Sequence, residues 1–235
     1  NFGVTTDYIF RGFSQSARDP AVQGGIDATY GIFYLGLWES QIKFKGGLDP
    51  TPPGAAFNAW PELDVYGGAK PVLKTSMGEF TFDFGFITYN YPGAFTPGSG
   101  LNYVELKAGV SKEVWKDATL STTLFWSPEY TLKTGSVWTS ETTLSQNLPA
   151  WGKVVPSVSG TFGYQWGDTA AYAIGIGNGD KGYAYWNVGA TLTFDEKVAF
   201  DVRYWDTSVS NAGGFCTGTV FQCDGRFVAS MKVTF

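Results

Sequence analysis

Strict alternation of apolar and polar residues is the feature that most limits how this chain can fold. In GEFTFDFGFITYNYP, Phe80, Phe82 and Phe84 alternate with Thr81 and Asp83. Successive side chains of an extended strand point to opposite faces, whereas an α-helix repeats every 3.6 residues. Phenylalanines spaced two apart therefore predict a strand with one apolar and one polar face.

The same alternation recurs along the whole chain. In the closing segment RFVASMKVTF, Arg226, Ser230 and Lys232 share one face, and the other face is apolar. The apolar face consists of Phe227, Ala229, Met231, Val233 and Phe235. We expect twelve strands in all, at residues 2–13, 21–30, 33–45, 59–70, 78–91, 102–113, 118–130, 137–148, 154–166, 183–194, 198–208 and 225–235.

The lengths of the strands and of their connections point to a membrane barrel. The predicted strands exceed the roughly five to six residues usual in globular proteins. They suit a tilted crossing of a bilayer, which takes about 9–11 residues. Short connections such as Asp195 to Lys197 alternate with long ones such as KGGLDPTPPGAAFN. Outer-membrane barrels show this asymmetry, with short periplasmic turns and longer extracellular loops.

Composition agrees with a membrane barrel. Charged residues make up 16% of the chain and aromatic residues 17%, against about 25% charged residues in a typical soluble domain. No stretch approaches the roughly 18 apolar residues of a membrane-spanning helix. The predicted fold is all-β: one transmembrane, antiparallel, up-and-down β-barrel domain over residues 1–235, with about twelve strands. A soluble β-sandwich or lipocalin-like barrel, with its apolar faces turned inward, is the alternative that alternation alone does not exclude.

The expected surroundings follow from this fold. The apolar faces should meet lipid and lipopolysaccharide in the outer membrane of a Gram-negative bacterium, and the polar faces a wet interior. The chain opens without a basic segment and an apolar run, so we expect an export signal to have been removed. We expect assembly machinery to read the C-terminal strand ending in Phe235.

Aromatic residues near the predicted strand ends indicate girdles at the two membrane interfaces. Those at the short-turn end are Tyr30, Tyr34, Trp115, Trp151 and Phe194, and those at the long-loop end are Phe44, Trp60, Tyr91, Trp126, Tyr130, Trp138, Trp166, Trp186 and Tyr204.

One segment, FYLGLWESQIKF, fits either orientation. We assign its charged residues, Glu39 and Lys43, to the lumen. This choice turns apolar residues of the segment inward, where they would narrow the lumen together with Phe125 and Trp205. The residues turned inward are Phe33, Leu35 and Leu37, and those turned to lipid are Tyr34, Trp38, Ile42 and Phe44.

The predicted lumenal face carries ten acids and six bases, a formal charge of −4. Rings of carboxylates favour cations in a pore, so a weak cation preference is one hypothesis. The other is that the charges pair across strands and hold a narrow barrel shut. The predicted pore-lining residues are Asp7, Arg11, Asp27, Glu39, Lys43, Glu62, Asp64, Asp83, Glu105, Lys107, Glu129, Glu141, Asp201, Arg203, Arg226 and Lys232.

Cys216 and Cys223 are the two cysteines of the chain. They do not form a C-x-x-C motif and the chain has no histidine, so we predict a loop-closing disulfide in an oxidising compartment and no zinc site. The segment GIGNGDKG, with Asn178 and Asp180, is faintly similar to a calcium loop but lacks the ligand spacing of an EF-hand. We interpret it as a turn and predict no metal or other cofactor.

Passive diffusion of small ions or solutes is the predicted function, since a twelve-stranded barrel is narrower than porins of about 16–18 strands. A non-conducting barrel that acts as a structural or binding component of an envelope assembly is the alternative. Catalysis is not expected, because histidine, the usual general base near neutral pH, is absent. The absence of a Lys/Arg cluster argues against nucleic-acid binding.

Several motifs together resemble a known family. They are VTTDYIFRGFSQSARDPAVQGGID, GIFYLGLWES, TYNYPG, an NLP turn, YWDT and the closing CDGRFVASMKVTF. This series is similar to that of the TorF-type family of proteobacterial proteins assigned as porins, with Thr6 in place of the usual serine. The resemblance spans almost the whole chain and is most specific in its first third. It implies an outer-membrane barrel with a pore, and it supplies no substrate.

Overall fold

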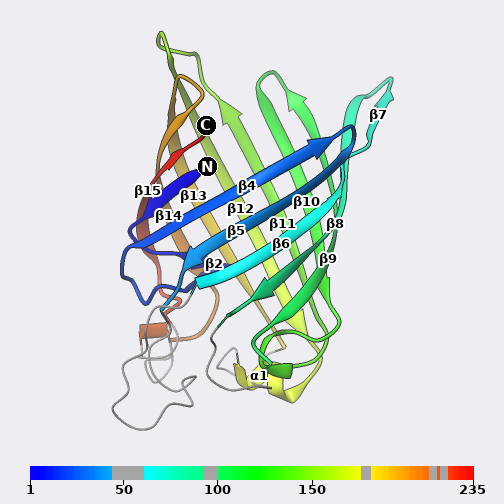
Figure 1. Cartoon of the computed structure of the whole chain (residues 1–235), viewed down its shortest axis with the longest axis vertical. Coiled ribbons are helices and arrows are strands. Elements are labelled where there is room, and N and C mark those ends of the chain that lie inside the picture. The colour runs from blue at the N-terminus through cyan, green and yellow to red at the C-terminus, as the bar shows by residue number, and fades with distance from the viewer. Residues whose placement is uncertain (44–60, 93–99, 176–180, 212–215, 218–221) are drawn as a thin grey trace.

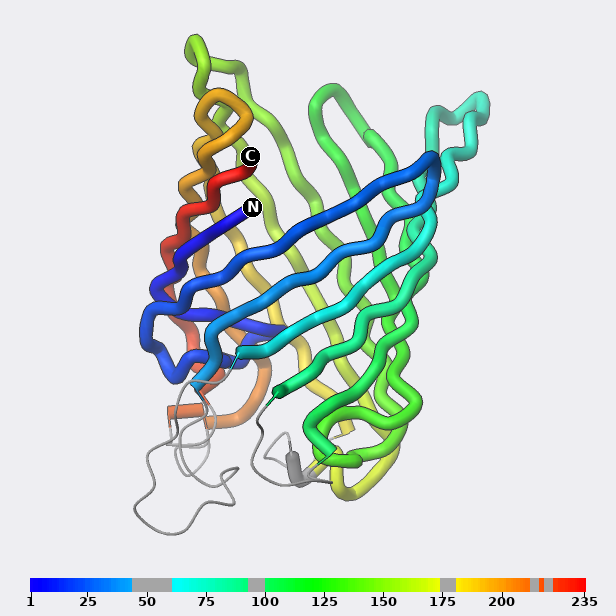
Figure 2. The backbone as a smooth tube through the Cα atoms, viewed as in Figure 1, coloured from blue at the N-terminus to red at the C-terminus, as the bar shows by residue number. Residues whose placement is uncertain are grey.

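The chain folds into a closed ring of antiparallel β-strands (Figures 1 and 2). This computed structural model describes residues 1–43, 61–92, 100–175, 181–211, 216–217 and 222–235. The predicted strand residues 44, 45, 59 and 60, and the GIGNGDKG residues 176–180, lie outside that range. The strands of the ring are β1 (Phe2–Thr5), β4 (Ala21–Tyr30), β5 (Phe33–Gln41), β6 (Pro61–Ala69), β7 (Val72–Thr75), β8 (Gly78–Asn90), β9 (Tyr103–Trp115), β10 (Ala118–Ser127), β11 (Val137–Asn147), β12 (Val154–Gly167), β13 (Gly182–Phe194), β14 (Val198–Thr207) and β15 (Arg226–Val233).

Pairing between β6 and β8 closes the ring. Leu63 lies opposite Asn90 and Ala69 opposite Phe84, and β7 then continues along the same neighbour. The break between β6 and β7 falls at Pro71, which has no backbone N–H to give to a ladder. Because β6 and β7 together form one interrupted strand, the barrel has twelve strands, and the predicted closed, antiparallel all-β fold is confirmed.

The connections alternate in length as predicted. Those that follow β4, β7, β9, β11 and β13 are short turns, and Figure 1 places them at one end of the barrel. The strand ends that lead into the long connections lie at the opposite end, and both chain termini lie toward the short turns. The first turn beyond Pro71 is a hairpin at 75–78, so the junction predicted between 70 and 77 is shorter than expected.

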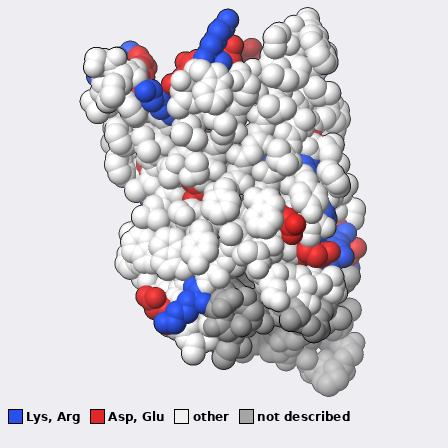
Figure 3. Space-filling view, turned by 180° about the vertical axis from the view of Figure 1, so that it is seen from behind, with Lys and Arg blue, Asp and Glu red and all other residues white. Residues whose placement is uncertain are grey.

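Two faces of opposite chemistry run along the wall. Phe227, Val188 and Leu106 point outward and are 75%, 60% and 49% exposed. Figure 3 shows one side of the barrel on which charged residues gather mainly toward the ends and the middle is largely uncharged. The inward residues of β11 and β12, such as Thr143 and Thr161, are hydrogen-bonded polar groups. An exposed apolar surface of this extent suits lipid rather than water.

The predicted orientation of β5 is wrong. Phe33, Leu35 and Leu37 are 61%, 56% and 44% exposed on the outward face. Trp38 lies opposite Asp64, which is buried on the inward face of β6. Directly opposed residues of antiparallel strands share a face, so Trp38 and its face mates Tyr34 and Ile42 point inward. Pairing with neighbouring strands sets this register, and the segment by itself carries no such information.

Part of the predicted aromatic girdle holds and part does not. Trp138 stacks on Trp166 at 6.4 Å between ring centroids, on the outward side of neighbouring strands. Tyr91 and Tyr130, by contrast, pack into the buried cluster inside the long-loop end. The hydroxyl of Tyr34 donates to the lumenal Asp83. These three tyrosines therefore do not belong to a lipid-facing girdle.

The first predicted strand, 2–13, is interrupted. β1 ends at Thr5, and two short strands, β2 (Ile9–Phe10) and β3 (Phe13–Ser14), form a separate two-stranded sheet. A hairpin thus replaces the second half of the predicted strand.

The rest of the described chain holds little helix and one disulfide. A 3-10 turn, η1, spans Thr131–Lys133, and the helix α1 spans Ala170–Gly175. Neither helix in the described range is long and apolar enough to cross a membrane. Cys216 and Cys223 form the predicted disulfide.

Substitutions at two adjacent positions on β10 test which face of the strand meets lipid and which meets the lumen. Leu124 points outward and Thr123 inward, toward Glu141 on the paired strand. We expect Leu124→Lys to lower the free energy of unfolding in phospholipid vesicles by about 2–4 kcal/mol, because a lysine near the middle of a lipid-facing strand loses its hydration. Thr123→Lys should cost much less. Urea unfolding followed by tryptophan fluorescence measures both, and equal costs would contradict the assignment of faces.

The disulfide should stabilise its loop modestly. Replacing both Cys216 and Cys223 by serine is expected to lower the free energy of unfolding by about 2–3 kcal/mol, because the closed loop is short. Reduction of the wild-type protein should give the same loss in a denaturant titration. Two free thiols in wild-type protein purified without reductant, detected by mass spectrometry, would rule out the bridge.

Candidate functional site

A hairpin folded into the barrel occupies the long-loop half of the lumen. The chain leaves the wall after Thr6, whose backbone N–H donates to the carbonyl of Ala229 at 2.9 Å. In the hairpin, Phe10 pairs with Phe13 and the turn consists of Arg11 and Gly12. Both turn residues have positive φ, 48° and 86°. Such a two-residue turn matches the twist of the strands it joins and favours glycine at its second position.

Close packing holds the tip of the hairpin against β13 and β14 of the wall. A Cβ atom on Gly12 would clash with the methyl group of Thr207. The hydroxyl of Tyr183 donates to the carbonyl of Arg11 at 3.1 Å. Tyr183 in turn packs edge-on against Phe13, with 5.3 Å between ring centroids. Glycine is thus required at the tip for both its backbone conformation and its lack of a side chain.

The strongest contact of the hairpin is a buried ion pair. Arg11 donates through both terminal nitrogens to Glu105 on β9, at 2.6 and 2.7 Å. The two side chains are 3% and 1% exposed, and Tyr89 donates to the same carboxylate at 3.1 Å. The guanidinium also lies over the ring of Phe125, 5.0 Å from its centroid. Burial lowers the pKa of Arg11, but Glu105 together with Tyr89 and Tyr130 raises it, so the net shift is upward and the group stays charged.

A second contact ties the hairpin to β6. Tyr8 donates to Glu62 at 2.6 Å, and Tyr91 donates to the other oxygen of that carboxylate at 2.7 Å. Burial and the charge of Glu62 raise the pKa of Tyr8 well above its ordinary value. Tyr8 therefore remains a neutral hydrogen-bond donor.

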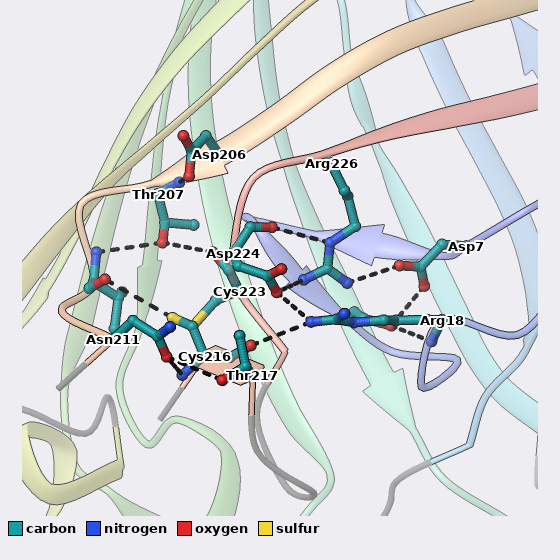
Figure 4. Close-up of polar contacts among 12 residues, drawn as sticks. Asp7, Arg18, Asp206, Thr207, Asn211, Cys216, Thr217, Cys223, Asp224 and Arg226 are labelled. Carbon is teal, nitrogen blue, oxygen red and sulfur yellow. Dashed lines mark hydrogen bonds and ion pairs between the residues drawn. A yellow bond between two sulfur atoms is a disulfide. The ribbon is translucent and has the colours of Figure 1, made fainter. Parts of the chain in front are cut away.

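A charged cluster anchors the base of the hairpin to the disulfide loop (Figure 4). Asp7 accepts from Arg226 on β15 at 3.0 Å, and Arg226 also donates to Asp224 at 2.6 Å. Arg18 pairs with the same Asp224 and donates to the carbonyl of Cys216. The hairpin is therefore fixed at its base, its middle and its tip.

Toward the short turns the lumen wall is polar, and several of its charges are paired. Lys107 pairs with Asp83 at 2.8 Å. Arg203 binds Asp201 at 2.7 Å and also donates to Asn187 at 2.6 Å. Tyr185 donates to Glu141, and its ring lies over Gly163, where a Cβ atom would clash with it. Lys107 and Asp83 form an ion pair between strands, as one of the two hypotheses expects, whereas Arg203 and Asp201 pair within β14.

Thirteen of the sixteen predicted pore-lining residues lie on the inward face of the wall or on the hairpin within it. Eight are acids and five are bases, which leaves a formal charge of −3 among them. They are Asp7, Arg11, Asp27, Glu62, Asp64, Asp83, Glu105, Lys107, Glu141, Asp201, Arg203, Arg226 and Lys232.

The other three lie elsewhere. Glu39 is on the outward face of β5, opposite Gly24 and Leu63, because that strand has the reverse orientation. Lys43 follows the end of β5 and pairs with Asp19 at the hairpin base. Glu129 follows the end of β10 and accepts from the backbone N–H of Gly135, so it belongs to a loop.

Sequence reasoning missed the hairpin and the tyrosines that bind the lumenal carboxylates. The dipeptide Arg11-Gly12 between two phenylalanines was the available signal, since glycine favours the second position of a tight hairpin turn. Tyr8 and Tyr89 sit at positions that alternation places on a strand face, and alternation does not reveal their partners. Tyr66, which donates to Asp27, is a further example.

Several solved structures of similar architecture are porins. The chain matches the NanC porin with a TM-score of 0.62 and 9% identity, covering 100% of both chains. It matches the KdgM porin with a TM-score of 0.55 and 11% identity, covering 100% of this chain and 98% of that one. A structure of the KdgM porin in complex with disordered oligogalacturonate also has a TM-score of 0.55, at 12% identity and the same coverage. Identities this low show a shared fold.

Sequence comparison places the chain in a family. No curated protein matches it in sequence. A family model described as bacterial protein of unknown function, Gcw_chp, matches residues 1–235. With this match over its full length, the twelve-stranded barrel belongs to the Gcw_chp family of bacterial proteins.

Proposed function

We propose that this chain is an outer-membrane channel through which small ions or solutes diffuse passively. The observation that carries the proposal is a closed barrel with an apolar exterior and a charged, hydrogen-bonded interior. A wall of this kind satisfies its backbone within lipid and leaves polar groups to a water-filled path. The likeness to porin structures and the resemblance to TorF-type porins support the same function.

The proposed setting is the outer membrane of a Gram-negative bacterium, reached after export. The apolar exterior would contact lipid and lipopolysaccharide, with the long loops outside the cell. Phe235 and the outward residues of β15 form the closing strand that assembly machinery would read. The oxidising periplasm would allow the disulfide between Cys216 and Cys223 to form.

The hairpin limits what would pass. It fills the long-loop half of a barrel that is already narrower than porins of about 16–18 strands. The solutes are therefore small. An acidic oligosaccharide such as the oligogalacturonate held by a KdgM structure is a poor candidate, because the inward carboxylates outnumber the bases and would repel it.

A weak preference for cations follows from the same imbalance. In the described chain Glu62, Glu141 and Asp27 receive tyrosine hydroxyls rather than a lysine or arginine. Hydrogen bonds from neutral donors leave the carboxylate charge in place. Catalysis is not part of the proposal, because the chain lacks histidine, the usual general base near neutral pH.

A non-conducting barrel within an envelope assembly is the second candidate. The buried Arg11–Glu105 pair favours it, because an ion pair that is 3% and 1% exposed leaves little room for water at that level. In this alternative the hairpin would block the lumen permanently, and the loops would bind the other components of the assembly.

Planar-bilayer recording separates the two candidates. We expect the purified wild-type protein to give small single-channel currents, with a reversal potential in a KCl gradient that indicates a weak preference for K⁺. The physical reason is the surplus of lumenal carboxylates. An anion-selective reversal potential would refute the cation preference, and no current from correctly folded protein would favour the plug.

Releasing the hairpin should widen the path. Arg11→Ala is expected to raise single-channel conductance several-fold and to lower the free energy of unfolding by about 3–5 kcal/mol, because Glu105 is left charged and buried without its partner. The double variant Arg11→Ala with Glu105→Ala removes both charges, so it should recover stability and keep the higher conductance.

Lys43→Ala is the matched control, since Lys43 forms an ion pair with Asp19 at the hairpin base, where the two side chains are 41% and 49% exposed. Its conductance should equal that of the wild type. If the double variant is folded and conducts no more than the wild type, the hairpin is not the constriction.

A further inference from the structure

A hollow opens on the outside of the wall at the long-loop end, beside the ends of β12, β13 and β14. Its volume is about 680 Å³, and its lining includes Tyr164, Trp166, Asp168, Lys181, Gly182 and Ser208. Trp166 on β12 pairs with Gly182 on β13, which has no side chain to fill the space beside the indole ring. The hydroxyl of Tyr164 lies so close to Gly182 that a Cβ atom there would clash with it.

One side of the hollow is the end of a row of aromatic rings on the outward face. Trp126 pairs with Trp138 and Trp138 pairs with Trp166, so the three indoles follow one another across β10, β11 and β12. Their ring centroids are 5.9 and 6.4 Å apart. Tyr164 stacks on Trp166 at 5.9 Å and is 43% exposed. The row therefore ends in accessible aromatic surface that borders the hollow.

The rest of the lining is polar. Asp168 follows the end of β12, Lys181 precedes β13 and Ser208 follows the end of β14. All three residues are exposed. Neither Asp168 nor Lys181 forms an ion pair with another residue of the described chain. A ligand in the hollow can therefore reach a cation, a carboxylate and a hydroxyl beside an aromatic surface.

The order of side chains along β12 indicates what kind of ligand fits. Phe162, which is 57% exposed, Tyr164 and Trp166 lie two residues apart on the outward face, and Asp168 comes just past the strand end. A change from apolar to aromatic to charged residues marks the level at which hydrocarbon gives way to lipid headgroups. A molecule bound at this level has acyl chains on one side and a polar headgroup on the other.

We propose that the hollow binds the phosphorylated sugar headgroup of a lipopolysaccharide molecule. The C–H groups on the face of a sugar ring carry a small positive charge, which suits the negative face of an aromatic ring such as Tyr164. Lys181 attracts a phosphate group, as basic residues at a membrane surface do. Asp168 and Ser208 offer hydrogen bonds to sugar hydroxyls, and the acyl chains lie against Phe162.

This inference rests on the outer-membrane setting of the proposed function and adds to it a defined lipid site. A single ring-sized hollow with both charge and aromatic surface distinguishes this place from the rest of the aromatic girdle. Trp126 and Trp138, farther along the same row, do not border the hollow.

Binding of a short-chain (rough) lipopolysaccharide to the full chain in detergent micelles, measured by thermophoresis, tests the site. The wild-type protein should bind it saturably, and should bind the dephosphorylated form about fivefold more weakly, because one lysine contact with a lipid charge is lost. Lys181→Gln should weaken binding of the phosphorylated form by a similar factor. The variant should then bind the two forms equally.

Two matched controls accompany the variants of the hollow. Lys153→Gln removes a lysine at the short-turn end, where it pairs with Asp195, and should bind as the wild type does. Trp166→Leu should bind several-fold more weakly, because the aromatic surface beside the sugar is lost. Trp126→Leu, at the far end of the same row, should keep the wild-type affinity. Circular dichroism verifies that each variant is folded.

Several outcomes would overturn the site. They are no saturable binding by the wild type, equal wild-type affinity for the two forms of the lipid, and a Lys181→Gln variant that still discriminates between them. Equally tight binding of phosphatidylglycerol, which has no sugar ring, would show that the hollow does not recognise a sugar. The wild-type comparisons remain decisive if a variant fails to fold.

The lipid titration and the bilayer recording fail independently. A silent recording with intact lipopolysaccharide binding would remove the channel and leave the lipid site. Conduction without lipopolysaccharide binding would remove the lipid site and leave the channel.

Discussion

The hydrogen-bonded ring of the wall is the constraint on which everything else in this structure depends. A sheet whose outward side is apolar tolerates no unpaired edge in lipid, and the pairing of β6 with β8 removes the last edge. Closure then divides the side chains of every strand into an exterior and an interior set. Alternate residues of a strand therefore face lipid and the lumen in turn. The register between strands is strongly constrained, because a slip of one residue would exchange the outward and inward side chains. The isolated β5 segment lacked this information, and its neighbours supplied it.

Within that ring the hairpin is a second structural element with its own source of stability. Few backbone hydrogen bonds join it to its surroundings, among them Thr6 to Ala229 and Ser14 to Gln222. Side chains do most of the joining: Arg11 to Glu105, Tyr8 to Glu62 and Asp7 to Arg226. Charge-assisted hydrogen bonds of this kind are strong when water is excluded, and costly when one partner is lost. The position of the hairpin is therefore specified by polar pairs in the interior, while the wall is specified by its backbone ladder and its apolar exterior.

Part of the candidate site could be predicted from the sequence, because local alternation fixes some strand faces and leaves others open. The faces of β6, β8, β9, β14 and β15 follow from period-two patterns, so Glu62, Asp83, Glu105, Arg203 and Lys232 were placed inward from the sequence. Glu39 was misplaced because its strand has apolar residues on one face and aromatic residues on the other, which leaves both orientations open. Lys43 and Glu129 were misplaced because the strands end earlier than their alternation suggests. The partner of Arg11 is 94 residues away in sequence, and no local pattern indicates it.

The sequence by itself determined the class of fold, the number of strands, the alternation of short and long connections and the chemistry of most strand faces, because these are local or periodic properties of an extended chain. Tertiary structure decided the orientation of β5, the inward course of residues 6–19 and the pairing of each lumenal charge. Those features depend on which strands become neighbours across the ring. Asp64 shows the difference most clearly: its place on an inward face can be read from β6 alone, whereas its lack of a partner appears only once Arg11, Tyr8 and Tyr91 have bound the carboxylates around it.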